Sequence, residues 1–296
     1  MGKKKKVKRS FEGYCSICKK FTKLTRDHVP PQGSINLRPV EIRMFHEHLK
    51  EAVYPVPVEK YQIDEDLQLR RKTVELSQSG VNFRSICDTC NNTLLGIHYD
   101  PELIKLSREL GLFVRTKYRS GIALPEQISL LVKTNRVARA VVGHLLAAVP
   151  WLASDKPFLV ENQFHESMRE YFLDPNKQLP EDLEIYYWLY PSNTYVIVRG
   201  LTVGRIDNGK YYVHGDLLKF LPVAFWVVYK HMSTGIVGAQ KLIKNREGGI
   251  DNSEYLDISF RRIPSIYWPE RPTEEFWTFM PPELSFFSEE RNTSNS

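Results

Sequence analysis

Four cysteines, arranged as two Cys-x-x-Cys pairs, constrain this chain more than any other feature of its sequence. They are Cys15, Cys18, Cys87 and Cys90, and the chain contains no other cysteine. Two thiolates three positions apart on a tight turn can both reach one ion at about 2.3 Å, so this spacing is typical of zinc sites. Disulfides suit small secreted proteins, and these 296 residues have neither a secretory signal nor a high cysteine density. We therefore predict that both pairs bind one structural Zn²⁺, with a redox motif or chance as the weaker interpretations.

Positive charge is concentrated at the N-terminal end. The first 31 residues carry ten Lys or Arg against Glu12 and Asp27, a net charge of +8, so the rest of the +6 chain sums to −2. A basic segment on a mildly acidic body favours a polyanionic partner. A solvated flexible arm over residues 1–10, or a nuclear localisation signal, is the alternative. The residues predicted to contact nucleic acid are Lys3, Lys4, Lys5, Lys6, Lys8, Arg9 and Arg26.

The sequence shows no sign of a membrane protein. No uninterrupted apolar run approaches the roughly 18 residues of a membrane span, and the basic N-terminus is not followed by an apolar stretch. Mean hydropathy is −0.37. We expect a cytoplasmic protein without a membrane partner.

Hydrophobic periodicity predicts both helices and strands. The expected helices are 39–52, 88–95 (ended by Gly96), 101–114 and 135–149. The expected strands are 21–29, 81–86, 184–190, 194–203, 210–214 and 224–229. His46 and His48 are interpreted as surface residues of the first helix, and His144 as a buried core histidine rather than a ligand. Tyr and Trp residues of the later strands are interpreted as sheet packing, with a base-stacking surface as the alternative.

Two further strings lie around the cysteine pairs. They are T25-R-D-H-V-P-P31 and N82-F-R-S-I-C-D-T-C-N91. Together with C15-S-I-C18 they resemble the His-Asn-His (ββα-metal) endonuclease family in its four-cysteine form, over about residues 11–100.

The resemblance implies a metal-dependent nuclease that hydrolyses phosphodiester bonds in DNA. His28 would be the general base, because a neutral imidazole can take a proton from water. Asp27 and Asn91 would bind one Mg²⁺ or Mn²⁺ through oxygen, and Asn82 would orient the His28 region. Many family members carry His where this chain has Asn91, and a neutral oxygen ligand favours Mg²⁺ over Zn²⁺ there. His98 is an additional candidate ligand or, preferably, a helix cap.

The expected fold class is α+β. Residues 1–10 would be a basic flexible arm, residues 11–100 a ββα-metal nuclease domain with an insertion at about 33–80, and residues 101–296 a second α+β domain. Neighbouring residues of a strand point to opposite faces, so Asp27 and His28 can serve one site only if the chain bends there.

Other functions remain open at this point. A non-catalytic zinc-ribbon protein that binds nucleic acid needs the cysteines and the basic residues only. A nuclease could also be the effector of a restriction or anti-phage defence system. Residues 101–296 would then bind a protein partner or an activating ligand. RNA is an alternative substrate, and a double-strand break would require a homodimer or two encounters.

Overall fold

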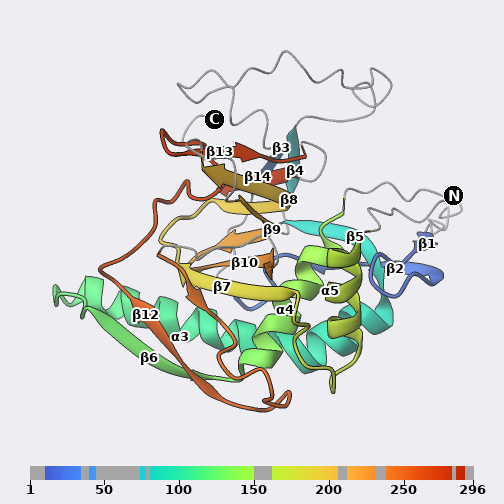
Figure 1. Ribbon diagram of the computed structural model, residues 1–296, viewed down its shortest axis with the longest axis horizontal. Coiled ribbons are helices and arrows are strands. Elements are labelled where there is room, and N and C mark those ends of the chain that lie inside the picture. Colours follow the sequence, from blue (N-terminus) through green and yellow to red (C-terminus); the bar gives the residue numbers. More distant parts are fainter. Residues whose placement is uncertain are drawn as a thin grey trace, which may run out of the picture.

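The computed structural model describes residues 11–34, 40–44, 74–77, 81–149, 162–205, 212–230, 238–281 and 285–290. They form a mixed α/β protein with few helices and several sheets (Figure 1). Within these ranges, no helix has both the length and the apolar character that crossing a membrane requires. The basic residues 3–9 lie outside the described ranges.

A small antiparallel sheet contains both cysteine pairs. It consists of β1 (Glu12–Tyr14), β2 (Phe21–His28) and β5 (Asn82–Cys87), in the order β1-β2-β5. The first pair lies in the turn between β1 and β2, where Lys19 has a φ of 60°. The second pair joins β5 to the helix that follows it. The predicted strands over residues 21–29 and 81–86 are confirmed.

The helix after β5 is longer and wider than the sequence predicts. It runs as the π-helix η2 (Thr89–Tyr99) and continues directly into α3 (Asp100–Arg119). The backbone N–H of Asp100 donates to the carbonyl of Leu95, five residues earlier, which is the π-helical pattern. The prediction that Gly96 ends the helix is therefore wrong. Leu95 and Tyr99 are both buried, and burial of this face stabilises the helix beyond the glycine.

Nine of the described strands form one large sheet, which is stacked through the middle of Figure 1. Its order is β11-β7-β10-β9-β8-β14-β3-β4, with β13 paired to β8. The bounds are β3 (Val40–Met44), β4 (Val74–Ser77), β7 (Leu183–Leu189), β8 (Tyr195–Arg205), β9 (Tyr212–Phe220), β10 (Val223–Tyr229), β11 (Gln240–Lys241), β13 (Phe276–Phe279) and β14 (Ser285–Glu290). All four strands predicted after residue 180 are present.

The helix predicted over residues 39–52 is wrong where the structure describes it. Residues 40–44 form β3, which pairs with β14 and with β4. The sequence Val-Glu-Ile-Arg-Met alternates apolar and polar residues with the period of a strand, and β14 provides a partner from the far end of the chain. His46 and His48 lie outside the described residues.

Both faces of the large sheet are covered. Along β7, Ile185, Tyr187 and Leu189 join one apolar cluster with the helices α4 (Thr134–Ala147) and α5 (Gln163–Leu173), whereas Tyr186 and Trp188 join a second cluster on the opposite face. Residues 264–281 contribute Trp268, Phe276 and Met280 to that second cluster. The aromatic residues of β7 are therefore sheet packing, as predicted.

One core connects the two halves of the chain. A single cluster of buried apolar residues includes Cys15 and Ile86 near the small sheet, Val141 in α4 and Phe286 in β14. A two-stranded sheet of β6 (Gln127–Val132) and β12 (Glu254–Ser259) lies beside α3 (Figure 1). The predicted boundary at residue 100 thus falls between two consecutive helices that share this core.

Candidate functional site

The four cysteines meet at one point, as their spacing predicts. Their Sγ atoms all lie within 4.8 Å of one another, and none of the four is in a disulfide. Cys18 Sγ and Cys87 Sγ are 3.7 Å apart, close to the edge of about 3.8 Å of a tetrahedron with Zn–S bonds of about 2.3 Å. The backbone N–H groups of Cys18 and Cys87 both point at Cys15 Sγ, at 3.5 and 3.4 Å. The cluster can hold a metal ion.

Without a cation, this cluster cannot carry four thiolates. Burial raises the pKa of Cys18 to about 11, with a further contribution from the neighbouring thiols. The pKa of Cys90 is raised by its hydrogen bond to Cys15 and by burial. The same hydrogen bond lowers the pKa of Cys15 to about 5. A dication must therefore displace protons from thiols, so its affinity falls as the pH falls.

The cysteine cluster is attached to α4. Ser16 Oγ donates to the carbonyl of Leu146 at 2.9 Å, and Ser85 Oγ donates to the carbonyl of Ala147. These carbonyls belong to the last turn of α4, where no further helical N–H is present to bond them. Serines of the β1–β2 turn and of β5 thus satisfy the C-terminal end of a helix from beyond the predicted boundary at residue 100.

A bulge in β5 lies opposite the end of β2. Thr25 is paired with Ile86 but Asp27 with Phe83, so β5 carries one extra residue between these pairs. Asp27, two positions after Thr25 on the same side of the strand, faces inward with 2% of its surface exposed, whereas Arg26 is exposed.

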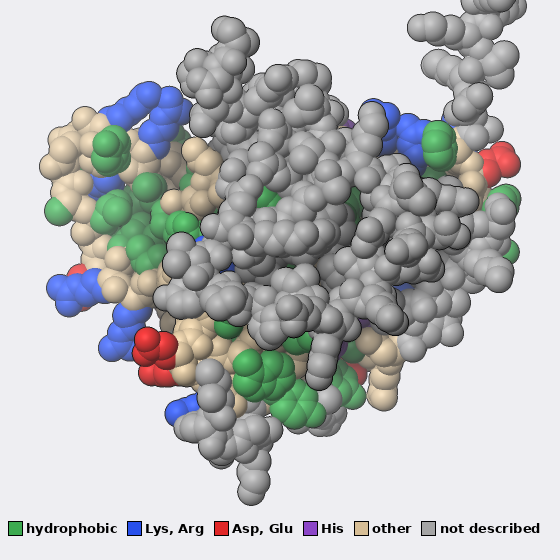
Figure 2. Space-filling model, turned by 90° about the horizontal axis from the view of Figure 1, so that it is seen from above, with side chains coloured by type: hydrophobic (Ala, Val, Ile, Leu, Met, Phe, Trp, Pro, Cys, Tyr) green, Lys and Arg blue, Asp and Glu red, His purple; other side chains and the backbone are tan. Residues whose placement is uncertain are grey.

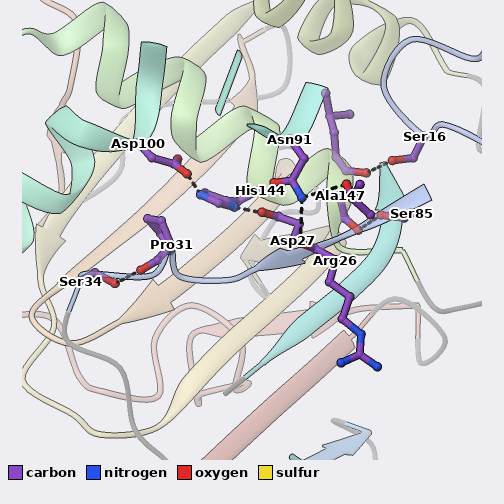
Figure 3. Close-up of polar contacts among 12 residues, drawn as sticks. Ser16, Arg26, Asp27, Pro31, Ser34, Ser85, Asn91, Asp100, His144 and Ala147 are labelled. Atoms are coloured by element: carbon purple, nitrogen blue, oxygen red, sulfur yellow. Dashed lines mark hydrogen bonds and ion pairs between the residues drawn. The ribbon is translucent and has the colours of Figure 1, made fainter. Parts of the chain in front are cut away.

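Asp27 ends in a buried row of three polar side chains. Asp27 Oδ2 lies 2.9 Å from Nδ1 of His144, and Nε2 of His144 lies 2.9 Å from Oδ1 of Asp100 (Figure 3). His144 comes from α4 and is fully buried, as predicted for a core histidine. The imidazole thus bridges the end of β2 to the first residue of α3.

This row holds two protons. An imidazole can bond two carboxylates only if both hydrogen bonds contain a proton, whether both lie on the ring or one lies on a carboxyl group. Burial lowers the pKa of His144, but Asp27 and Asp100 outweigh that effect and raise it to about 10. Burial also raises the pKa of Asp27, against the opposing effect of His144. The two protons are therefore retained at neutral pH, and the row carries one negative charge.

His28 lies on the other face of β2 from Asp27 and is partly exposed. Its Nε2 lies 3.1 Å from Nε2 of Gln32, a contact in which the amide donates to a ring nitrogen without a proton. Asn82 is directly opposite His28 in the β2–β5 register. The structure thus places His28, the predicted base, opposite Asn82, the residue predicted to orient it. Both side chains lie away from the inward-facing carboxylate of Asp27.

Asn91 lies in the first turn of η2 and contacts the strand that carries Asp27. Its Nδ2 donates to Thr25 Oγ1 at 2.9 Å and to the carbonyl of Arg26 at 2.8 Å. With the nitrogen so placed, the amide oxygen of Asn91 remains an acceptor. Figure 3 shows Asn91 and Asp27 side by side, with the Arg26 side chain directed away.

Asp27 and Asn91 carry oxygen atoms of the kind that a hard cation binds. The contact with His144 uses Asp27 Oδ2, and a carboxylate has a second oxygen that can bind a cation. Asn91 contributes a neutral amide oxygen next to it. Mg²⁺ binds oxygen ligands and keeps several waters, whereas only 2% of the Asp27 surface is exposed.

The outer face of the small sheet combines positive charge with exposed aromatic rings. Phe11, Tyr14 and Phe21 are 45%, 37% and 57% exposed. The guanidinium of Arg84 lies 4.5 Å from the Phe11 ring centre. Lys23 and Arg26 are exposed on β2. In Figure 2, Lys and Arg side chains border hydrophobic ones at the right-hand edge, the side on which Figure 1 places β1 and β2.

Sequence analysis missed the partnership of His144 with Asp27. The two residues are 117 positions apart, and no local pattern connects them. A signal was nevertheless present: a histidine within an apolar helix must find a polar partner when it is buried. His98, by contrast, is exposed in the last turn of η2 and is not part of the cysteine cluster.

No protein-family model, curated protein or solved structure matches this chain, so the candidate site is described from its own geometry.

Proposed function

We propose that this protein is a metal-dependent endonuclease of the His-Asn-His type, which hydrolyses phosphodiester bonds in DNA. The observation that carries the proposal is that Asp27 and Asn91 lie side by side at the end of β2, close to the four-cysteine cluster, with His28 as the next residue along the strand. The order of elements supports it, because two antiparallel strands, β2 and β5, are followed by the helix η2 that contains Asn91.

Each residue has a separate role in the proposed reaction. His28 takes a proton from the attacking water, for which its partial exposure at the end of β2 is suitable. Asp27 and Asn91 hold Mg²⁺ or Mn²⁺ through oxygen. When bound, such a cation stabilises the charge that develops on the phosphate. Asn82 keeps its position opposite His28 and so fixes the strand end that presents the base.

The metal of the cysteine cluster is proposed to be zinc with a structural role. Four thiolates satisfy a tetrahedral Zn²⁺ completely and leave no position for water or substrate. The cluster connects the turn before β2 with the start of η2. His28 lies on β2, and Asn91 lies on η2. Zinc would therefore hold the proposed catalytic residues together without taking part in the chemistry.

A plasmid assay tests the proposed activity directly. Purified zinc-loaded protein should convert supercoiled DNA to the nicked form in the presence of Mg²⁺ or Mn²⁺, and should not do so when neither ion is added. A single site of this kind cuts one strand, so nicks should precede linear product. Supercoiled DNA that persists under all these metal conditions, together with tight DNA binding, would favour a non-catalytic nucleic-acid binder.

The proposed nuclease and a non-catalytic nucleic-acid binder would both use the basic and aromatic face of the small sheet to bind DNA. The contribution of this face to DNA binding can be measured. Replacing Lys23, Arg26 and Arg84 with Gln should weaken DNA binding and flatten its salt dependence, by about 0.9 in the logarithmic slope for each phosphate that the protein no longer neutralises. Deleting residues 1–10 should flatten it further. The measurement is the DNA dissociation constant between low and physiological salt.

The matched control removes three exposed arginines of α3 and should leave that slope unchanged. They are Arg108, Arg115 and Arg119. Equal slopes for the two triple variants would mean that the small sheet is not the DNA-binding surface.

A further inference from the structure

The carboxylate of Asp27 is held by a residue from beyond the predicted domain boundary at residue 100. Both ring nitrogens of His144 lie 2.9 Å from a carboxylate oxygen, one of Asp27 and one of Asp100. An imidazole bonded at both nitrogens cannot rotate without breaking one of the two bonds. Its direction in the core is thus fixed, and the direction of the Asp27 carboxylate is fixed with it.

The connections around Asp27 form a closed loop. Asn91 in η2 donates to the backbone of Arg26 and to Thr25. The same helical run continues into Asp100, which bonds His144, and His144 returns to Asp27 (Figure 3). The end of β2 is therefore bonded on one side through its backbone and on the other through its buried carboxylate.

This arrangement leads to a specific role for His144. We propose that His144, itself oriented by Asp100, is a positioning residue that presents Asp27 to the catalytic cation, so that α4 completes the nuclease site. The inference rests on the proposed function. It deepens that function by making α4, which lies beyond residue 100, part of the site. Groups that orient a metal ligand typically change metal affinity or activity by about 10- to 100-fold when they are removed.

Two substitutions at the same position separate positioning from general support of the core. In His144→Asn the amide nitrogen can take the place of Nδ1 and still donate to Asp27, whereas the bond to Asp100 is removed. In His144→Gln the amide nitrogen takes the place of Nε2, so the bond to Asp100 remains and the bond to Asp27 is removed. Each variant removes one of the two buried hydrogen bonds of His144. If His144 only supported the core, the two variants would therefore change Mn²⁺ binding equally.

Binding of Mn²⁺ to the zinc-loaded full chain is the main readout, measured by electron paramagnetic resonance. Asp27→Asn identifies which bound Mn²⁺ belongs to this site. We expect His144→Gln to weaken Mn²⁺ binding about 10- to 100-fold and to nick DNA normally only at raised metal concentration. His144→Asn should remain within a few-fold of the unaltered protein in both measurements.

A second buried histidine provides a matched control for loss of stability. His165 in α5 lies 3.0 Å from Asp216 in β9, is also buried, and belongs to no part of the proposed site. His165→Asn should lower the melting temperature but leave Mn²⁺ affinity unchanged.

The possible outcomes separate this inference from the proposed function. Equal Mn²⁺ affinities for His144→Asn and His144→Gln, in a protein that still nicks DNA, would overturn the positioning role alone. A parallel loss of Mn²⁺ affinity in His165→Asn would do the same. An unaltered protein that neither binds Mn²⁺ at Asp27 nor nicks DNA would overturn both proposals.

Discussion

Replacing His28 with alanine should slow DNA cleavage roughly 10²- to 10⁴-fold, the usual effect of losing a general base, and leave the rest of the protein intact. The imidazole lies on the outer face of β2, away from the buried row and from the cysteine cluster. Its removal should therefore not change zinc content, melting temperature or DNA affinity. Nicking rates at saturating Mg²⁺, with elemental analysis and thermal unfolding, provide the measurement.

His98→Ala is the matched control for this experiment. His98 is also an exposed histidine of the N-terminal part, at the end of η2, and it belongs to neither proposed metal site. Its loss should leave the nicking rate unchanged. If the His28→Ala protein nicks DNA as fast as the His98→Ala protein, the base lies elsewhere and the resemblance to the family extends only to the scaffold.

Asp27→Asn distinguishes the metal ligand from the base. Asparagine keeps the size of the side chain but removes the negative charge that attracts a cation. Activity should fall because the metal binds weakly, and higher Mg²⁺ or Mn²⁺ should restore part of it. The same increase in metal should not restore His28→Ala, because that protein still binds its cation and lacks only the proton acceptor.

Local spacing predicted the parts of the structure that depend on local geometry. The two Cys-x-x-Cys pairs form one cluster, because each pair already positions two thiols and little freedom remains for how they can meet. The strongly apolar segment 135–149 forms α4 at residues 134–147. The strands after residue 180 also follow their apolar pattern.

The features that the sequence did not predict depend on distant partners. Residues 40–44 form a strand because β14, more than 240 positions later, pairs with them. The bulge in β5 shifts the pairing opposite the end of β2, and one-residue shifts of register leave no trace in hydrophobic periodicity. His144 was correctly predicted to be buried, but its partners became known only when α4 was placed against β2.

Replacing Cys87 with serine should have the largest effect on the fold. One of four thiolates is removed, and zinc binding in small zinc domains contributes about 10–16 kcal/mol of apparent folding free energy, of which this protein would lose a large part. The bound zinc should disappear, and residues 11–100 should become sensitive to protease. Elemental analysis and limited proteolysis, with intact mass spectrometry of the fragments, would measure both effects.

The damage should also spread beyond residue 100 into α4, because Ser16 and Ser85 satisfy the last carbonyls of this helix. Ser16→Ala is the control: it removes one of these hydrogen bonds, worth about 0.5–1.5 kcal/mol, and keeps every thiol. It should retain zinc and lose only a few degrees in melting temperature. A Cys87→Ser protein that keeps its metal and melts like Ser16→Ala would show that the four thiols are not the ligands on which this fold depends. The unaltered protein should lose the same structure when a strong chelator removes its zinc, and regain it when zinc is returned.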